Sequence, residues 1–130
     1  MASIFSKIIS GEIPSFKVYE DELCYAFLDI RPLKKGHTLV IPKQEIDYIF
    51  DIPDSLYSHL LLTAKKIAIG MKKVLPCEKI GMSVVGLEVP HAHIHLVPIN
   101  SVKDMTFGQG FVQLSNEELA EIADQIAASI

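Results

Sequence analysis

The sequence predicts an α+β protein: a mainly antiparallel sheet of about five strands, with a long central helix and a C-terminal helix packed against it. Five segments have the apolar, aromatic-rich composition of strands, and the longest apolar pattern has helical spacing. Strands and helices do not alternate as they do in a doubly wound parallel sheet. The 130 residues suit one hydrophobic core, so we expect a single domain over residues 1–130.

The N-terminal part predicts one short helix and three strands. Apolar residues recur at helical spacing over Ile4–Ile9, and this pattern ends before Gly11. Residues 17–20 and 23–29 are rich in aromatic and aliphatic side chains on either side of an acidic corner, which favours a β-hairpin. Residues 37–41 have strand composition and stop at a proline.

The remaining part predicts a long helix, two strands and a last helix. After Pro53, which suits an early helical position, the apolar residues keep to one helical face for about six turns. Residues 79–85 and 89–99 are expected to be strands that pair as a hairpin across a short connection. Ser115 and Glu118 form a capping-box pattern in front of an apolar stripe, which predicts the C-terminal helix.

Composition and charge exclude several classes of function. The formal net charge of −4 gives no cationic field for DNA, RNA or anionic lipid, so we expect no nucleic-acid partner. The apolar stretches are far shorter than the roughly 20 residues of a membrane-spanning helix, and the first residues lack a secretory pattern, so we expect a cytoplasmic protein without a membrane partner. Cys24 and Cys77 belong to no CxxC pair, so neither a disulfide framework nor a zinc knuckle is indicated.

Three of the five histidines lie in one short run, VPHAHIHLVP. Because side chains alternate along a strand, His91, His93 and His95 are expected to share one face of the sheet. The alternate positions are apolar and should face the core: Ala92, Ile94 and Leu96. Strand residues two apart are separated by roughly 6.5–7 Å, so neighbouring imidazoles could flank a phosphorus centre.

The residues alone leave three interpretations of this run. The histidines could be structural, although three imidazoles on one face increase each other's desolvation and charge costs. They could bind zinc or another transition metal, with His37, Glu88 or Asp29 as a further ligand, although no anionic ligand stands at a recognisable spacing. A neutral imidazole could also attack an electrophile while its neighbours act as orienting groups and acid.

Four ordered segments decide among these interpretations. Residues 91–98 are similar to the His-x-His-x-His-x-x motif of the histidine triad (HIT) family. Residues 4–14 resemble that family's IF-x-KII-x-GEIP segment, residues 26–32 its AF-x-DI-x-P segment, and residues 36–43 its GH-x-LVIPK segment. The chain is therefore identified as a member of this family, nearest its nucleoside-phosphoramidase-like branch.

The resemblance implies a homodimer of α+β protomers that binds a purine nucleotide and cleaves the bond between its α-phosphate and an amine or similar leaving group. His93 would be the nucleophile and would form a nucleotidyl-histidine intermediate that water resolves. His95 would bind phosphate oxygens. His91 and His37 would lie behind the nucleophile and fix its tautomer. We expect no cofactor and no structural metal.

The resemblance also implies a nucleoside site. Phe5, Ile8, Phe27 and Ile30 match positions that form an apolar slot around the base, and Asp29 matches a carboxylate that accepts hydrogen bonds from ribose hydroxyls. Without the resemblance, the two phenylalanines would be interpreted as ordinary core residues and Asp29 as a turn residue.

The chain departs from the family pattern in two places. The loop before the histidines is short, and Leu87 and Glu88 occupy positions where polar or small hydroxyl residues are common. Alternation would turn Glu88 away from the histidines, whereas a carboxylate on the leaving-group side would attract a cationic amine. Ser3 and Ser6 stand where some relatives have zinc-binding cysteines. The alternatives are a nucleotide-binding scaffold with incidental catalysis and a metal-dependent hydrolase.

Overall fold

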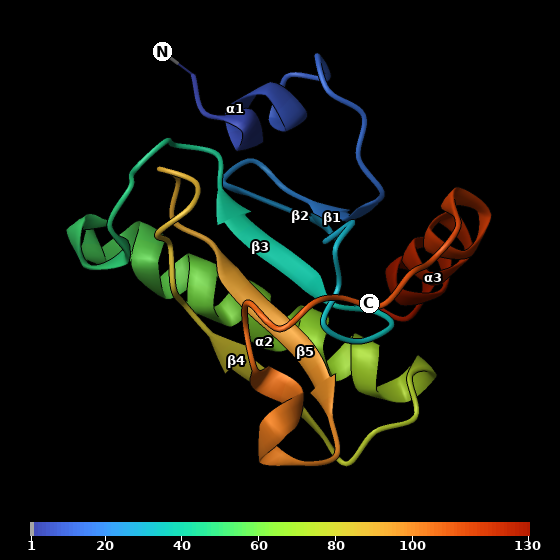
Figure 1. Cartoon of the computed structure of the whole chain (residues 1–130). Helices are drawn as coiled ribbons and strands as arrows, with labels where there is room; N and C mark the ends of the chain where they lie inside the picture. The colour runs from blue at the N-terminus through green and yellow to red at the C-terminus, as the bar shows by residue number, and fades with distance from the viewer. Residues whose placement is uncertain (1) are drawn as a thin grey trace.

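The fold is built on an antiparallel sheet of five strands in the order β1-β2-β3-β5-β4 (Figure 1). The structure is a computed structural model that describes residues 2–130. The strands are β1 (Lys17–Glu20), β2 (Cys24–Leu28), β3 (Thr38–Pro42), β4 (Lys79–Ser83) and β5 (Ile94–Ile99). Each neighbouring pair is antiparallel, which confirms the predicted α+β class.

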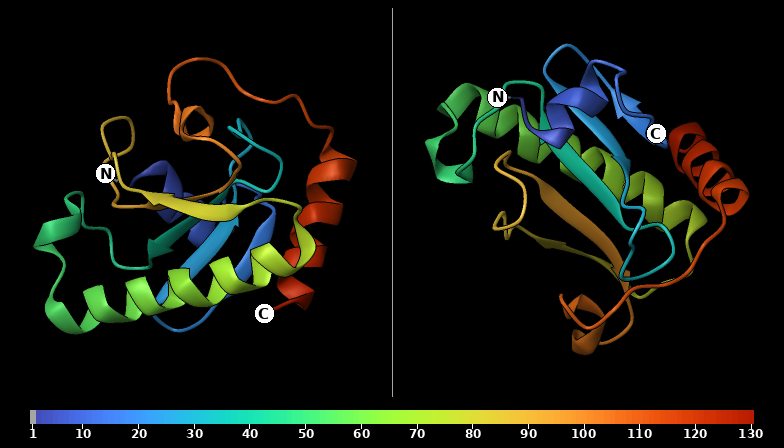
Figure 2. Two further views of the ribbon diagram at one scale, coloured as in Figure 1. Left: turned by 90° about the horizontal axis from the view of Figure 1, so that it is seen from below. Right: turned by 45° about the horizontal axis from the view of Figure 1, so that its top comes forward.

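The helices cover both faces of this sheet. They are α1 (Ile4–Ile9), α2 (Asp54–Val74) and α3 (Asn116–Ala128), with 3-10 turns η1 (Ile49–Asp51) and η2 (Val102–Met105). Figure 2 shows α2 along one face, α1 and the segment between η2 and α3 on the opposite face, and α3 beside β1. Both bonds of the predicted capping box form between Ser115 and Glu118, each at 3.1 Å. Among the described residues, no helix is long and apolar enough to cross a membrane.

Each face of the sheet buries its own apolar cluster. The larger cluster lies between the sheet and α2 and includes Ala26, Val40 and Leu60. The smaller cluster lies on the face of α1 and contains Phe5, Tyr25, Phe27, Leu39 and Ile41. Consecutive residues of β3 therefore enter different clusters, as the two-residue period of a strand requires.

The strand that carries the histidines is shorter than predicted. β5 begins at Ile94 and not at residue 89, because the backbone just before it pairs elsewhere: His91 N–H donates to Val89 O (2.8 Å) and Ala92 N–H to Ile46 O (2.7 Å). The hairpin of β4 and β5 is confirmed, but its connection covers residues 84–93. The predicted alternation survives, since Ala92 and Ile94 enter the larger cluster.

Candidate active site

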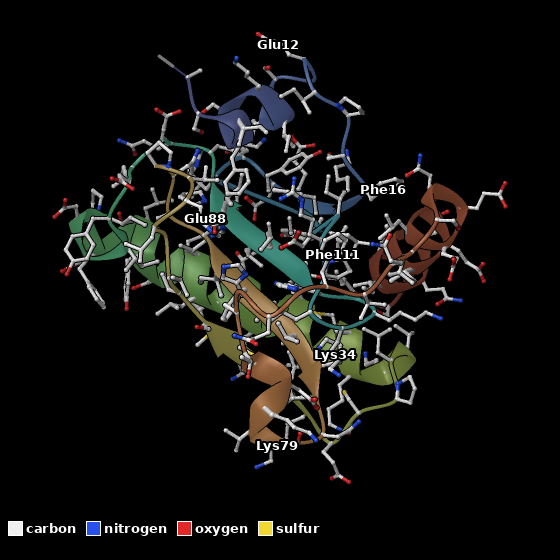
Figure 3. All side chains as sticks on the ribbon, in the orientation of Figure 1. Glu12, Phe16, Lys34, Lys79, Glu88 and Phe111 are labelled. Atoms are coloured by element: carbon white, nitrogen blue, oxygen red, sulfur yellow. The ribbon has the colours of Figure 1, made fainter. Side chains whose placement is uncertain are left out.

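A cavity of about 430 Å³ lies in front of the first residues of β5. Its walls are His37, His93 and His95, the side chains of Asp29 and Arg31, and residues from segments 85–88 and 107–111. Figure 3 labels one residue from each of these two segments, Glu88 and Phe111. The fold therefore brings three of the four predicted catalytic histidines to one cavity.

His93 faces this cavity with a defined nitrogen. Its Nδ1 lies 2.8 Å from the carbonyl oxygen of His91, and a carbonyl only accepts, so Nδ1 carries the proton and donates. In the neutral ring, Nε2 is then left with a lone pair. Among the described residues, every fully buried side-chain nitrogen or oxygen has a hydrogen-bond partner. Nε2 of His93 has no protein partner, so it is not fully buried and is open to the cavity. The ring is held edge-on by Phe5, with 5.0 Å between ring centroids.

His95 presents the opposite hydrogen-bonding character because of a relay behind it. The backbone N–H of Leu33 donates to Nδ1 of His37 (3.0 Å), which leaves the proton of a neutral His37 on Nε2. That Nε2–H donates to Nδ1 of His95 (2.9 Å), so a neutral His95 carries its own proton on Nε2. Burial lowers the pKa of His37 to about 4 and that of His95 to about 3, so both rings are neutral at physiological pH.

The cavity therefore offers one lone pair and one N–H donor side by side. The rings of His93 and His95 have centroids 4.9 Å apart, and their Nε2 atoms carry these two functions. A lone pair can attack an electrophilic centre while the neighbouring donor stabilises an anionic oxygen on that centre. Both tautomers are fixed by protein groups before a ligand arrives, so no proton has to move for binding.

The fourth histidine, His91, lies behind the site and is fully buried. Its Nε2–H donates to the carbonyl of Pro42 (2.7 Å), and its Nδ1 accepts from the hydroxyl of Ser3 (2.9 Å). Burial is the main cause that lowers its pKa, so this ring too is neutral. Of the two histidines expected to fix the tautomer of His93, His91 bonds to it through its backbone carbonyl, whereas the ring of His37 bonds to His95 and not to His93.

A network of serines and one glutamate holds His91 and α1 together. Glu45 Oε1 accepts from the backbone N–H of Ser3 (2.6 Å) and from the hydroxyl of Ser6 (2.7 Å). The Ser3 hydroxyl also caps α1 by accepting from the N–H of Ser6 (3.1 Å). These hydrogen bonds lower the pKa of Glu45 to about 2. Ser3 and Ser6 thus have structural partners at the positions where metal-binding cysteines were considered.

Asp29 lines the cavity as predicted. Its Oδ1 accepts from the backbone N–H of Arg31 (2.8 Å), and its Oδ2 lies 3.8 Å from Nε2 of His37. Burial is the largest cause that raises its pKa, and the nearby charge of Glu88 raises it further. Oδ2 therefore remains available as an acceptor for a ligand hydroxyl.

The residues expected to hold the base do not line this cavity. Phe5 and Phe27 are buried in the smaller cluster, where their rings meet edge to face at 5.4 Å. Ile8 packs partly buried against that cluster, whereas Ile30 is 65% exposed next to Asp29. The apolar residues thus stand beside the cavity, and the core interpretation of the two phenylalanines agrees with the packing.

Sequence reasoning missed the segment that covers the histidines from the other side. The ring of Phe107 lies 4.8 Å from that of His95, and the N–H of Val112 bonds to the carbonyl of Pro32 (2.8 Å). Gly108 and Gly110 have φ values of 81° and 98°, which favour glycine. The pattern Phe-Gly-x-Gly-Phe at residues 107–111 is the sequence signal that could have indicated this segment.

Glu88 is also placed differently from the simplest expectation. Alternation along a strand would turn it away from the histidines, but residues 84–93 are not a strand, and Glu88 lines the same cavity. Gly86, with φ of 71°, lies in this connection and turns the chain before Glu88. The carboxylate is therefore part of the site.

Among residues 2–130, two groups of side chains could each hold a metal ion, because the ligand atoms within each group lie within 4.8 Å of one another. One group is Asp29, His37 and His95, and the other is Asp21, Cys24 and His59. In the first group the facing histidine nitrogens already bond to each other, so a metal ion would have to break the relay. In the second group His59 bonds to Asp21 (2.8 Å), and burial raises the pKa of the Cys24 thiol to about 11, away from the thiolate that binds metals.

Comparisons with known proteins agree with the fold and the motif. The HIT domain model matches residues 10–102. A HIT-like protein of Borreliella burgdorferi is 38% identical over 98% of this chain and 97% of its own length. The adenosine 5'-monophosphoramidase hnt1 of Schizosaccharomyces pombe is 34% identical over 100% of this chain and 99% of its own.

A solved structure extends this agreement to three dimensions. The crystal structure of a HIT-like protein from Bartonella henselae superposes with a TM-score of 0.86 and 32% sequence identity, covering 98% of this chain and 96% of the other. Its similarity spans the sheet, the helices and the segment that carries the histidines. The chain therefore belongs to the HIT family.

Proposed function

We propose that the protein is a nucleotide hydrolase or nucleotidyl transferase that cleaves the α-phosphate bond of purine nucleoside phosphoramidates. One observation carries the proposal: the lone pair on Nε2 of His93 and the N–H on Nε2 of His95 open onto one cavity. Similarity to a monophosphoramidase over the whole chain supports this choice of substrate class. Residues 1–130 would form one catalytic domain.

The first step would be attack by Nε2 of His93 on the α-phosphorus. A P–N bond to histidine forms, the bond to the leaving nitrogen breaks, and that nitrogen takes up a proton. The ring of His93 becomes cationic, and its charge strengthens the hydrogen bond from Nδ1–H to the carbonyl of His91. His95 donates to a phosphate oxygen and stabilises its developing charge.

The second step would be attack by water on the nucleotidyl-histidine. The new P–O bond replaces the bond to His93, whose electron pair returns to Nε2, and the attacking water gives up a proton to solvent as the nucleoside monophosphate is released. The nucleoside would extend from the phosphate toward Asp29, whose Oδ2 would accept from the ribose hydroxyls. The base would lie against the exposed Ile30 and the partly buried Ile8, with Phe5 and Phe27 behind them.

The test is hydrolysis of a fluorogenic adenosine 5'-phosphoramidate. His93→Ala should lower kcat by at least about 1,000-fold, as removal of a nucleophile does. His59→Gln is the matched control, because His59 is a histidine outside the cavity whose side chain, among the described residues, bonds only to Asp21. Mass spectrometry of the acid-quenched wild type should find the nucleotidyl adduct on His93. Equal rates for wild type and His93→Ala would contradict the proposal, and nucleotide binding without turnover would favour a scaffold.

We also propose that the protein works as a homodimer in the cytoplasm. β4 is an edge strand of the sheet and exposes Met82, while the neighbouring α2 exposes Leu62 and Ile69. Exposed apolar side chains along an unpaired strand edge suit pairing with a second copy. Light scattering after size exclusion would report twice the monomer mass of 14.4 kDa if this is right.

A further inference from the structure

Glu88 is a carboxylate of the cavity for which the proposed chemistry has no role. It lies on the connection from β4 to β5 (Figure 3), and it lines the cavity together with His93 and His95. Within residues 2–130 it forms no ion pair, and no side-chain hydrogen bond satisfies it. Asp29, the other carboxylate of the cavity, accepts from the backbone of Arg31 and lies close to His37.

The charges around the cavity do not suit an anionic ligand alone. The charged side chains of the lining are Asp29, Glu88 and Arg31, and His37 and His95 are neutral. Arg31 balances one of the two carboxylates, so the lining carries one uncompensated negative charge. A phosphate bound beside His93 adds another negative charge, and like charges in a partly enclosed site repel each other. A positive group on the ligand would remove this repulsion.

We infer that Glu88 determines leaving-group specificity by binding a cationic group on the departing amine, so that phosphoramidates of diamines are the favoured substrates. This inference rests on the proposed function and names its leaving-group class. When Nε2 of His93 bonds to phosphorus, the P–N bond breaks and its electron pair stays on the leaving nitrogen, which takes a proton from solvent water. Glu88 pairs with the second, already protonated nitrogen and neither gains nor loses a proton.

The test compares two substrates that differ only in that second charge: the adenosine 5'-phosphoramidates of 1,4-diaminobutane and of butylamine. The wild type should have a kcat/KM several times higher for the diamine compound, about fivefold for a solvent-accessible ion pair. Glu88→Gln should abolish this preference. It should also raise the butylamine rate, because removing the carboxylate relieves its repulsion of the phosphate.

The matched control is Glu12→Gln, which makes the same change of net charge at an exposed carboxylate far from the cavity (Figure 3). It should keep the wild-type preference. A charge reversal, Glu88→Lys, provides a second variant: it should instead favour a phosphoramidate of 4-aminobutyrate, whose leaving group carries a carboxylate.

The outcomes separate this inference from the proposed function. If the wild type hydrolyses both compounds equally well, or if Glu88→Gln keeps the full preference, Glu88 has no such role while phosphoramidate hydrolysis stands. If the wild type hydrolyses neither compound, the proposed function fails and the inference falls with it. A preference that is lost in Glu88→Gln and inverted in Glu88→Lys supports the inference.

Discussion

The two faces of the sheet are stabilised in different ways. On the face of α2, side chains such as Val40, Ile94 and Leu60 are apolar and completely buried. On the opposite face, four histidines with 0–8% exposure lie around a small aromatic cluster, and each ring has a specific hydrogen-bond partner. The segment 91–96 supplies both faces by simple alternation.

This difference shows how a small protein can hold a reactive group rigidly. Burial of apolar area stabilises the α2 face without a directional requirement. On the histidine face, burial keeps the rings of His37, His91 and His95 neutral. Backbone groups at fixed positions decide which nitrogen of His93 and His37 carries the proton. Packing on one face therefore fixes the geometry of the chemistry on the other.

The largest expected effect separates two adjacent residues. His93→Ala should remove turnover but lower the free energy of unfolding by less than Ile94→Ala, because one edge of the His93 ring borders the cavity. Ile94→Ala should lower the free energy of unfolding by about 2–5 kcal/mol, since Ile94 is fully buried in the larger cluster. Urea denaturation and steady-state kinetics of both variants measure the two effects.

In that experiment, the folded fraction of Ile94→Ala should keep kcat within about threefold of wild type. If Ile94→Ala loses turnover as fully as His93→Ala while remaining folded, the two faces are coupled more tightly than their packing indicates.

The second prediction uses pH to weaken only the histidine face. His37 and His95 have folded pKa values of about 4 and about 3, below the ordinary histidine value, so the unfolded chain binds more protons between pH 6.5 and 4. Stability is therefore complete above about pH 6.5 and is lost as the pH falls toward 4. At about 1.4 kcal/mol per pKa unit, and about two units for each of the two rings, the loss by pH 4.5 should be on the order of 5 kcal/mol.

Urea midpoints at pH 7 and pH 4.5 test this effect. Asp21 and Glu45 have pKa values lowered to about 2 from ordinary values of 3.8 and 4.5, so most of their contribution to stability is lost below pH 4.5 and little of it within this window. His95→Gln should lose less stability over the same interval. If His95→Gln loses as much stability between pH 7 and pH 4.5 as the wild type does, His95 is not responsible for the loss.

The smallest expected effect concerns the hydroxyl that joins α1 to His91. Ser3→Ala removes the cap of α1 and the donor to Nδ1 of His91, and should lower the free energy of unfolding by about 1 kcal/mol. Thermal unfolding followed by circular dichroism measures the change. Ser58→Ala, on the exposed side of α2, should be neutral, and a cost there equal to that of Ser3→Ala would contradict a specific role for Ser3.

Much of the fold could be predicted because its signals are local. The apolar period after Pro53, the Ser115–Glu118 capping box and the alternation through the histidine run each depend on neighbouring residues, and the structure has all three. The start of β5 could not be predicted in this way. It depends on a hydrogen bond from Ala92 to the distant Ile46, which competes with strand pairing.

The site was predictable in its residue types but not in its connections. The motif placed His37, His93 and His95 in one site, yet their order in the relay depends on Leu33, a backbone donor without a sequence signal. Phe107 approaches His95 because the chain crosses back over the sheet after η2, a long-range event that local patterns do not record.

The cavity places an acceptor, Nε2 of His93, beside a donor, Nε2–H of His95, and this arrangement makes the site stereoselective. A phosphorus atom attacked from the side of His93 would turn only one of its two free oxygens toward His95, so these oxygens are no longer equivalent. Sulfur in place of either oxygen creates a stereocentre at phosphorus, and the two resulting diastereomers would fit this arrangement unequally. The small relay from Leu33 thereby makes the site distinguish the two prochiral oxygens of an achiral phosphoryl group.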